Sequence, residues 1–177
     1  KNDFKNKHPS NQNFYLVYLP AFSDEKIISV LSKVDFVKWI IFSKNAKKDY
    51  SIDNIEIIPI SSRIFGEKII YSKGVLCGGG FETPSEALYL KKKLIVVPMK
   101  NQFEQQCNAE ALKKMGVQIL YKFNQDSIKQ LEKWIESDSI IDVDYSEDPI
   151  EVIQKVLSDY RKRMTVLKGR QLINEIN

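Results

Sequence analysis

The chain has 177 residues, 43% of them hydrophobic, and a formal net charge of +4 from 27 basic and 23 acidic residues. This length suits one domain with a real core, and no apolar run approaches the roughly 18–20 residues that span a bilayer. The basic residues are spread out rather than gathered in a stripe or arm, so nucleic acid is not an expected partner, whereas peripheral contact with anionic lipid stays open.

Apolar runs alternate with helical patterns along most of the chain. Residues 1–12 lack periodicity and are expected to be a linker or loose terminus. Six strands are predicted, over residues 14–19, 37–42, 55–60, 75–77, 94–97 and 117–121. Helices are predicted from residue 24, over 62–71, from 83, over 102–115 and over 127–136, and a last one from Asp148 has apolar residues Ile150, Ile153, Val156, Leu157, Tyr160 and Met164 on one side.

Apolar strands separated by helices predict a parallel sheet covered on both faces. The expected fold is therefore α/β, with one Rossmann-like domain over residues 13–177 that includes a carboxyl-terminal helix. Ligands of such sheets lie beyond the carboxyl ends of the strands. The segments expected to form a site are consequently residues 20–23, 61–63, 78–86 and 98–105.

Histidine and cysteine are scarce. The single histidine, His8, lies in the opening segment, so the chain offers no second histidine for a catalytic triad or a zinc site. Cys77 and Cys107 have neither a metal-binding spacing nor a disulfide framework. Both are predicted to be buried, unreactive thiols, which indicates a reducing compartment.

The first helix start of interest follows three consecutive glycines, in the stretch Gly-Gly-Gly-Phe-Glu-Thr-Pro-Ser-Glu over residues 78–86. Thr83 is predicted to be the N-cap and Glu86 the third helical residue, as in a capping box. Helix starts attract anions, and glycines let a phosphate approach the backbone. The pattern fits a diphosphate site, and it equally fits a tight turn in which Glu86 only caps its helix.

The second helix start has a similar arrangement, with Asn101 as the predicted N-cap and Glu104 in the first turn. Gln105 and Asn108 flank Glu104, and a carboxylate with amides suits sugar hydroxyls, which need both acceptors and donors. The alternative is that Glu104 only caps its helix. The apolar face of this helix is predicted to consist of Phe103, Cys107, Ala111 and Met115.

These two motifs carry a resemblance to a known family. The stretch GGGFETPSEALYLKKKLIVVPMKNQFEQQCNAEALKKMG resembles the nucleotide-sugar-binding half of GT-B-fold glycosyltransferases, in particular MurG-like and related bacterial and archaeal enzymes. Their pattern reads GG-x-x-T-x-x-E-A-x-x-x-x-K-P-x-x-x-x-P followed by E/D-Q-x-x-N-A. In this chain Leu94 stands where the family has the first proline, and residues 19–23 lack the glycines often found after the first strand.

The resemblance implies a role for each matching residue. The donor diphosphate would lie against Gly79, Gly80, Phe81 and Thr83, with the ribose on Glu86, the transferred sugar on Glu104 and Gln105, and the base near Ile60 and Ser61. The donor would be a nucleotide diphosphate sugar, UDP-linked by default, without a bound metal ion. Asp142-Val143-Asp144 matches the D-x-D of metal-dependent GT-A enzymes but is interpreted as a solvated acidic loop.

The resemblance also implies a missing half. The acceptor site and the catalytic residues of such enzymes belong to an amino-terminal domain, so this chain is expected to be an excised carboxyl-terminal domain. The alternative is an Alg13-type subunit that pairs with a separate membrane partner. Either protein would be cytoplasmic, with contact at the membrane surface left open. Two further readings remain, half of a nucleotide-sugar 2-epimerase and a non-catalytic binding or assembly domain.

Overall fold

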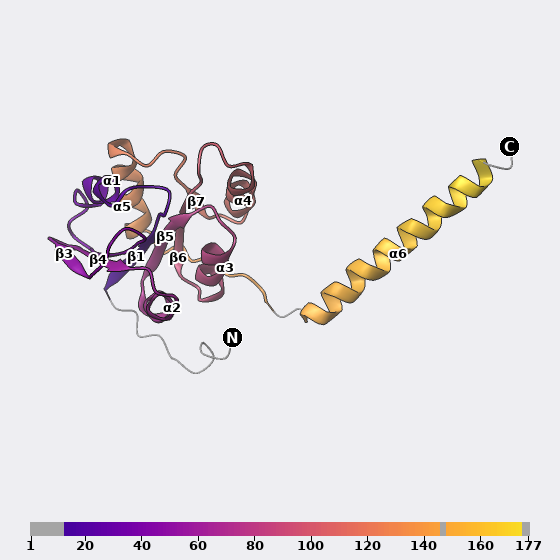
Figure 1. Ribbon diagram of the computed structural model, residues 1–177, viewed down its shortest axis with the longest axis horizontal. Coiled ribbons are helices and arrows are strands. Elements are labelled where there is room, and N and C mark those ends of the chain that lie inside the picture. The colour runs from indigo at the N-terminus through magenta and orange to yellow at the C-terminus, as the bar shows by residue number, and fades with distance from the viewer. Residues whose placement is uncertain (1–12, 146–147, 175–177) are drawn as a thin grey trace. The chain divides into compact units, whose positions relative to one another are not determined.

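The computed structural model describes residues 13–145 and 148–174, which fall into two compact units that divide after Val143. The first unit is an α/β domain and the second contains a single long helix (Figure 1).

A mostly parallel sheet of seven strands forms the centre of the first unit. The strands are β1 (Phe14–Tyr18), β2 (Lys38–Ser43), β3 (Tyr50–Ile52), β4 (Ile55–Pro59), β5 (Gly74–Gly78), β6 (Lys93–Val97) and β7 (Gln118–Ile119). Their order in the sheet is β3-β4-β2-β1-β5-β6-β7, and only the β3–β4 pair is antiparallel. The predicted Rossmann-like α/β fold is confirmed.

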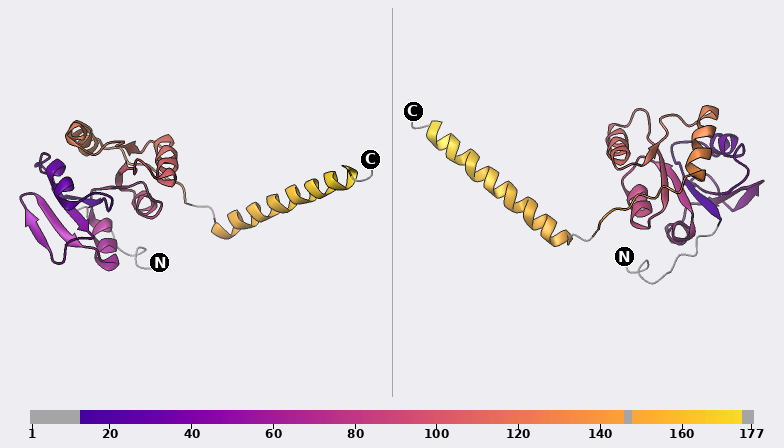
Figure 2. Two further views of the ribbon diagram at one scale, coloured as in Figure 1. Left: turned by 45° about the horizontal axis from the view of Figure 1, so that its top comes forward. Right: turned by 180° about the vertical axis from the view of Figure 1, so that it is seen from behind.

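Helices cover both faces of this sheet. They are α1 (Asp24–Leu31), α2 (Ser62–Tyr71), α3 (Glu82–Tyr89), α4 (Phe103–Lys114) and α5 (Ile128–Glu136), the last preceded by the short 3-10 helix η1 (Gln125–Ser127). One buried cluster joins α1 and α5 to the sheet, and a second joins α2, α3 and α4 to the other face. Figure 2 shows the same two layers from further directions.

The two clusters form because successive side chains of a strand point to opposite faces. In β1, Tyr15 and Val17 belong to the α1/α5 cluster, whereas Phe14 and Leu16 belong to the other. Leu16 and Val17 are both fully buried, as expected for the central strand of a sheet covered on both sides.

Two strands differ from the sequence prediction. The antiparallel strand β3 was not predicted, because Tyr50, Ser51 and Ile52 are all exposed and give no apolar run. It pairs with β4 through a tight turn in which Asp53 has a φ of 50°, a left-handed conformation that Asp tolerates. The last strand was predicted over residues 117–121, but only Gln118 and Ile119 form β7.

Both predicted capping boxes are wrong. Helix α3 begins at Glu82 after Phe81, and α4 begins at Phe103 after Gln102, and neither start has a side-chain cap. Pro84 therefore lies inside the first turn of α3, where its missing N–H breaks no helical hydrogen bond. Neither Glu86 nor Glu104 therefore caps its helix.

The predicted apolar face of α4 is also wrong, because the helix packs through Ala109 and Leu112 instead. Phe103 is 81% exposed and Met115 43% exposed. Cys107 lies on this outer side and is exposed, so its predicted burial is wrong, whereas Cys77 is buried as predicted. Burial raises the pKa of the Cys77 thiol, which keeps it protonated and unreactive.

The second unit contains α6 (Pro149–Asn174). Among residues 13–145 and 148–174, no helix combines the length and the apolar character needed to cross a membrane. The segment 1–12, predicted to be a linker, and His8 within it lie outside the described residues.

Candidate functional site

The order in which successive strands are added to the sheet reverses beside β1. The chain passes from β1 to β2 and β4 on one side, then returns to place β5, β6 and β7 on the other. Such a switch point leaves a crevice at the carboxyl ends of the strands, because the connecting segments diverge there. The crevice of this sheet therefore lies between the ends of β1 and β5.

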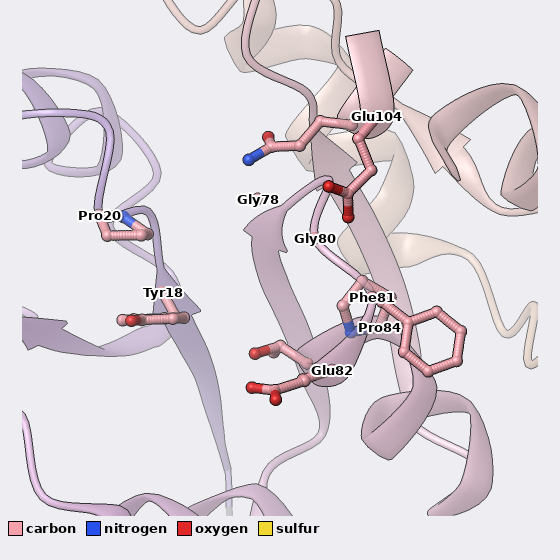
Figure 3. Close-up of a pocket in the computed structure, with 10 residues that line it drawn as sticks. Tyr18, Pro20, Gly78, Gly80, Phe81, Glu82, Pro84 and Glu104 are labelled. Carbon is pink, nitrogen blue, oxygen red and sulfur yellow. The ribbon is translucent and has the colours of Figure 1, made fainter. Parts of the chain in front are cut away.

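A cavity of about 460 Å³ occupies this crevice, and we call it the glycine-turn cavity. On one side it is lined by Tyr18, the last residue of β1, and by Pro20 in the loop that follows, and on the other side by the starts of α3 and α4. Figure 3 shows Glu82 and Glu104 extending toward the cavity from those helix starts, while the Phe81 ring points away from it. The full lining is Tyr18, Pro20, Gly78, Gly80, Phe81, Glu82, Thr83, Pro84, Glu104 and Gln105.

A second cavity of about 270 Å³, the aromatic cavity, shares three lining residues with the first, namely Tyr18, Glu82 and Thr83. The rings of Tyr18 and Phe42 each contact Phe65 edge-on, with centroids 5.6 and 5.0 Å away. The other residues that line the aromatic cavity are Ile60, Ser61, Ser62, Gly66 and Glu86. The two cavities therefore meet at α3, one with an apolar wall and one with a polar, glycine-lined wall.

Glycine is present at positions 79 and 80 for two different structural reasons. A Cβ at Gly79 would lie 2.9 Å from the Gln105 carbonyl oxygen and 3.2 Å from the Pro98 Cα, so glycine is needed for backbone packing. A Cβ at Gly80 would meet nothing within 4 Å, because this residue faces the open cavity. The close approach predicted for the glycine run is therefore made at Gly79 by the protein itself.

Two amide side chains of α4 hold the glycine turn. The Oε1 of Gln105 accepts hydrogen bonds from the backbone N–H of Gly79, at 3.3 Å, and of Met99, at 3.0 Å. The Nδ2 of Asn108 donates to the Gly79 carbonyl oxygen at 3.2 Å. Gln105 and Asn108 therefore join the two helix starts into one surface, a role that spacing along a helical wheel did not reveal.

The start of α3 offers unpaired donors to the glycine-turn cavity. The first N–H groups of a helix have no partner within it, and they carry the positive end of the helix dipole. Within the described part of the chain, the backbone N–H groups of Gly80, Phe81, Glu82 and Thr83 have no hydrogen-bond acceptor. This arrangement suits an anion.

The charged side chains of the cavities are all acidic. Glu82 lines both cavities, Glu104 the first and Glu86 the second, and no lysine, arginine or histidine lines either one. Desolvation at the cleft raises the pKa of Glu86, and the Glu82 carboxylate one turn earlier raises it further. Carboxylates in such a place are suited to accept hydrogen bonds from hydroxyl groups rather than to contact phosphates.

The structure brings eight of the nine sequence-predicted site residues to the cavities. Gly80, Phe81, Thr83, Glu104 and Gln105 line the glycine-turn cavity, and Ile60, Ser61, Thr83 and Glu86 line the aromatic cavity. Gly79 lines neither, since it packs under Gln105.

Sequence reasoning missed Tyr18, Glu82 and the aromatic pair Phe42 and Phe65. Tyr18 and Phe42 occupy the ends of predicted strands, a position that could have marked them. Phe65 had no comparable signal, because only the packing of α2 on the sheet turns it toward β1.

The Asp142-Val143-Asp144 segment lies outside the cavities. Asp142 forms an ion pair with Lys91 at 2.7 Å, and both side chains are exposed. Across residues 13–145 and 148–174, no group of three or more histidine, cysteine, aspartate or glutamate residues is arranged to hold a metal ion.

A mostly parallel sheet with a switch-point crevice, a glycine turn and two open helix starts defines a Rossmann-like domain, the fold found in GT-B glycosyltransferases. The sequence model of the family described as glycosyl transferase family 1 matches residues 1–137. The chain belongs to this family. A comparison with curated proteins finds no match.

Solved structures share the fold at low sequence identity. The glycosyltransferase SnogD from Streptomyces nogalater is 14% identical with a TM-score of 0.53, over 76% of this chain and 37% of its own. MurG from Acinetobacter baumannii is 15% identical with a TM-score of 0.54, over 73% and 43%. The solution structure of ALG13 is 13% identical with a TM-score of 0.56, over 78% and 92%. The chain thus spans about two fifths of the first two proteins and nearly all of the third.

Proposed function

We propose that this domain binds the nucleotide diphosphate sugar of a glycosyltransferase, with UDP as the nucleotide, and that a separate domain or subunit binds the acceptor and supplies the catalytic residues. The observation that carries the proposal is the pair of adjoining cavities at the switch point, one with an aromatic wall and one lined by free helix N–H groups. A nucleoside diphosphate has the same two parts, an apolar base and an anionic diphosphate.

The proposed roles follow this division. The base lies against Ile60 and Ser61 in the aromatic cavity, and Glu86 accepts hydrogen bonds from the ribose hydroxyls. The diphosphate lies over Gly80 against the N–H groups of Phe81 and Thr83. Gly79 supports this turn without contacting the phosphate, because its N–H is already bonded to Gln105.

The sugar would lie farther along the glycine-turn cavity, near Glu104 and Gln105. The Oε1 of Gln105 already has two backbone donors, so Gln105 offers a sugar only the N–H groups of its Nε2. Glu104 offers only acceptors. Together the two side chains can therefore donate hydrogen bonds to sugar hydroxyls and accept hydrogen bonds from them. No resident metal ion is part of the proposal, since the helix starts supply the positive potential.

Two arrangements of the whole enzyme fit this domain. In one it is the carboxyl-terminal half of a single two-domain chain, as the partial coverage of the longer relatives suggests. In the other it is a separate subunit that pairs with an acceptor-binding partner. The second is favoured by the extent of the likeness to ALG13, which covers 92% of that chain.

Titration of the chain with UDP, GDP and dTDP tests donor binding, by calorimetry or by ligand-observed NMR. We expect UDP to bind the chain in the millimolar range, because the proposal assigns the other wall of the cleft to a separate domain or subunit. Tighter binding of GDP or dTDP would overturn the choice of base but keep the donor site. Failure of all three nucleotides at millimolar concentration would falsify the donor-domain proposal.

A further inference from the structure

Helix α6 carries an apolar stripe with no use in the donor site. Of six large apolar side chains on the helix, five recur at alternating spacings of three and four residues, and the sixth, Val156, precedes Leu157 directly; on a helical wheel all six fall on one side. All are exposed, by 36% to 62%. They are Ile150, Ile153, Val156, Leu157, Tyr160 and Met164.

The carboxyl-terminal half of α6 is strongly basic. From Arg161 to Asn174 the sequence contains Arg161, Lys162, Arg163, Lys168 and Arg170 and no acidic residue. On a helix of 3.6 residues per turn, Arg161 and Arg163 fall at the two borders of the apolar stripe. An apolar stripe with cations at both borders of one end fits a helix that lies on an anionic membrane surface.

The same charges disfavour pairing with a second copy. If the stripe were the seam of a coiled coil, the charged flanking positions among the described side chains would be Arg161 and Arg163, both basic. Like charges beside a seam repel in parallel and antiparallel pairs alike, because only basic residues are available to face one another. An anionic surface instead complements every one of them.

We propose that α6 binds the surface of an anionic lipid bilayer, with its apolar stripe at the acyl boundary and its basic residues on the headgroups. The helix would lie along the surface rather than cross it, since it is not apolar enough to span. The proposal is independent of donor binding, because neither cavity contains a residue of α6.

Co-sedimentation of the full chain with sucrose-loaded vesicles provides the first test. With equal parts of phosphatidylglycerol and phosphatidylcholine we expect most of the chain to pellet, and with phosphatidylcholine alone at least about tenfold weaker partitioning. The triple variant Arg161→Gln/Lys162→Gln/Arg163→Gln should lose about tenfold or more on the anionic vesicles. No pelleting of the wild-type chain, or equal pelleting with both vesicles, would overturn the proposal.

A matched control variant separates the effect of the charges on α6 from the effect of the net charge of the chain. Lys44, Lys47 and Lys48 are exposed in the loop between β2 and β3, so Lys44→Gln/Lys47→Gln/Lys48→Gln removes the same three charges from the sheet domain. This variant should pellet like the wild-type chain. If both triple variants lose binding equally, net charge alone attracts the protein and α6 is not the binding element.

Tryptophan reporters test which side of α6 meets the lipid. Tyr160 lies in the stripe and Ser158 on the opposite side of the helix, and the natural Trp39 and Trp134 are buried and give a constant background. Emission of Tyr160→Trp should shift to the blue with anionic vesicles, whereas that of Ser158→Trp should not. A blue shift without lipid, together with a dimer in sedimentation equilibrium, would assign the stripe to a second copy and overturn the proposal.

Discussion

The side-chain Oε1 of Gln105 accepts a hydrogen bond from the backbone N–H of Gly79, so the start of α4 holds the turn that leads into α3. Because the same oxygen also accepts from the Met99 N–H, this one side chain connects three segments. The sequence offered a structural alternative, helix capping, for Glu104 and none for Gln105. In the structure Glu104 makes no cap, whereas Gln105 makes the structural contacts.

Substitutions of Gln105 should separate its two roles. Gln105→Ala removes two hydrogen bonds and should lower the free energy of unfolding by about 1–2 kcal/mol, measured by urea denaturation. Gln105→Glu keeps an acceptor oxygen and should lose less stability. Because both variants lack the Nε2 donor, both should reduce the preference for UDP-sugar over UDP. A fully stable Gln105→Ala variant would contradict the role assigned to the Gly79 contact.

Alanine at the two neighbouring glycines should give opposite results. Gly79→Ala forces a Cβ against backbone atoms of residues 98 and 105, and should lower the free energy of unfolding by about 1–3 kcal/mol. Gly80→Ala has free space and should leave the melting temperature nearly unchanged, yet weaken UDP binding by filling the diphosphate position. Unchanged UDP affinity in Gly80→Ala would place the diphosphate elsewhere.

Glu86→Gln tests the ribose contact. The carboxylate should bond the ribose hydroxyls more strongly than an amide, so UDP affinity should fall by about 1–3 kcal/mol in calorimetry. The melting temperature should barely change, because Glu86 caps no helix. Equal affinity combined with a clear loss of stability would show that Glu86 serves the fold alone.

The pKa of Glu86 should respond to its neighbour. Desolvation is the larger cause of the raised pKa of Glu86, and the charge of Glu82 is the smaller one. Glu82→Gln should therefore lower the pKa of Glu86 partway toward its ordinary value, which carbonyl chemical shifts can follow. A raised folded pKa adds stability below the ordinary pKa of glutamate, and this stability is lost as the pH rises through the folded pKa. Glu86→Gln should abolish that part of the pH dependence, and UDP binding should weaken as the pH falls through the same range.

Buried Lys92 should make stability depend on alkaline pH. Its Nζ donates to the Ile70 carbonyl oxygen at 2.6 Å near the end of α2, while burial lowers its pKa to about 8. Between pH 8 and the ordinary lysine pKa of 10.5 the unfolded chain binds more protons, so stability should rise with pH there. Denaturation of Lys92→Met should lack this rise, while Lys91→Met, at an exposed position, should keep it.

Much of the site was predictable because it depends on local chain direction. Strands that end at one edge of a parallel sheet bring their following loops together, so residues 61, 80 and 104 could be grouped before any packing was known. The exposed strand β3 and the aromatic contact of Phe65 could not be predicted, because neither gives a periodic apolar pattern in the sequence. The predicted N-caps Thr83 of α3 and Asn101 of α4 were misplaced by two residues and by one residue, because neither helix start has the side-chain cap on which the prediction relied.

The sequence by itself determined the α/β class, the parallel strands and the presence of a helix after the glycines and of another after β6, since these follow from apolar periodicity and turn chemistry along the chain. Only the tertiary structure decided what each glycine is for. Whether a Cβ is tolerated depends on atoms 26 residues away in the chain, and Gln105 lies over Gly79 while open space lies over Gly80. Contacts between segments distant in sequence carry no periodic signal, so they appear only when the sheet brings those segments together.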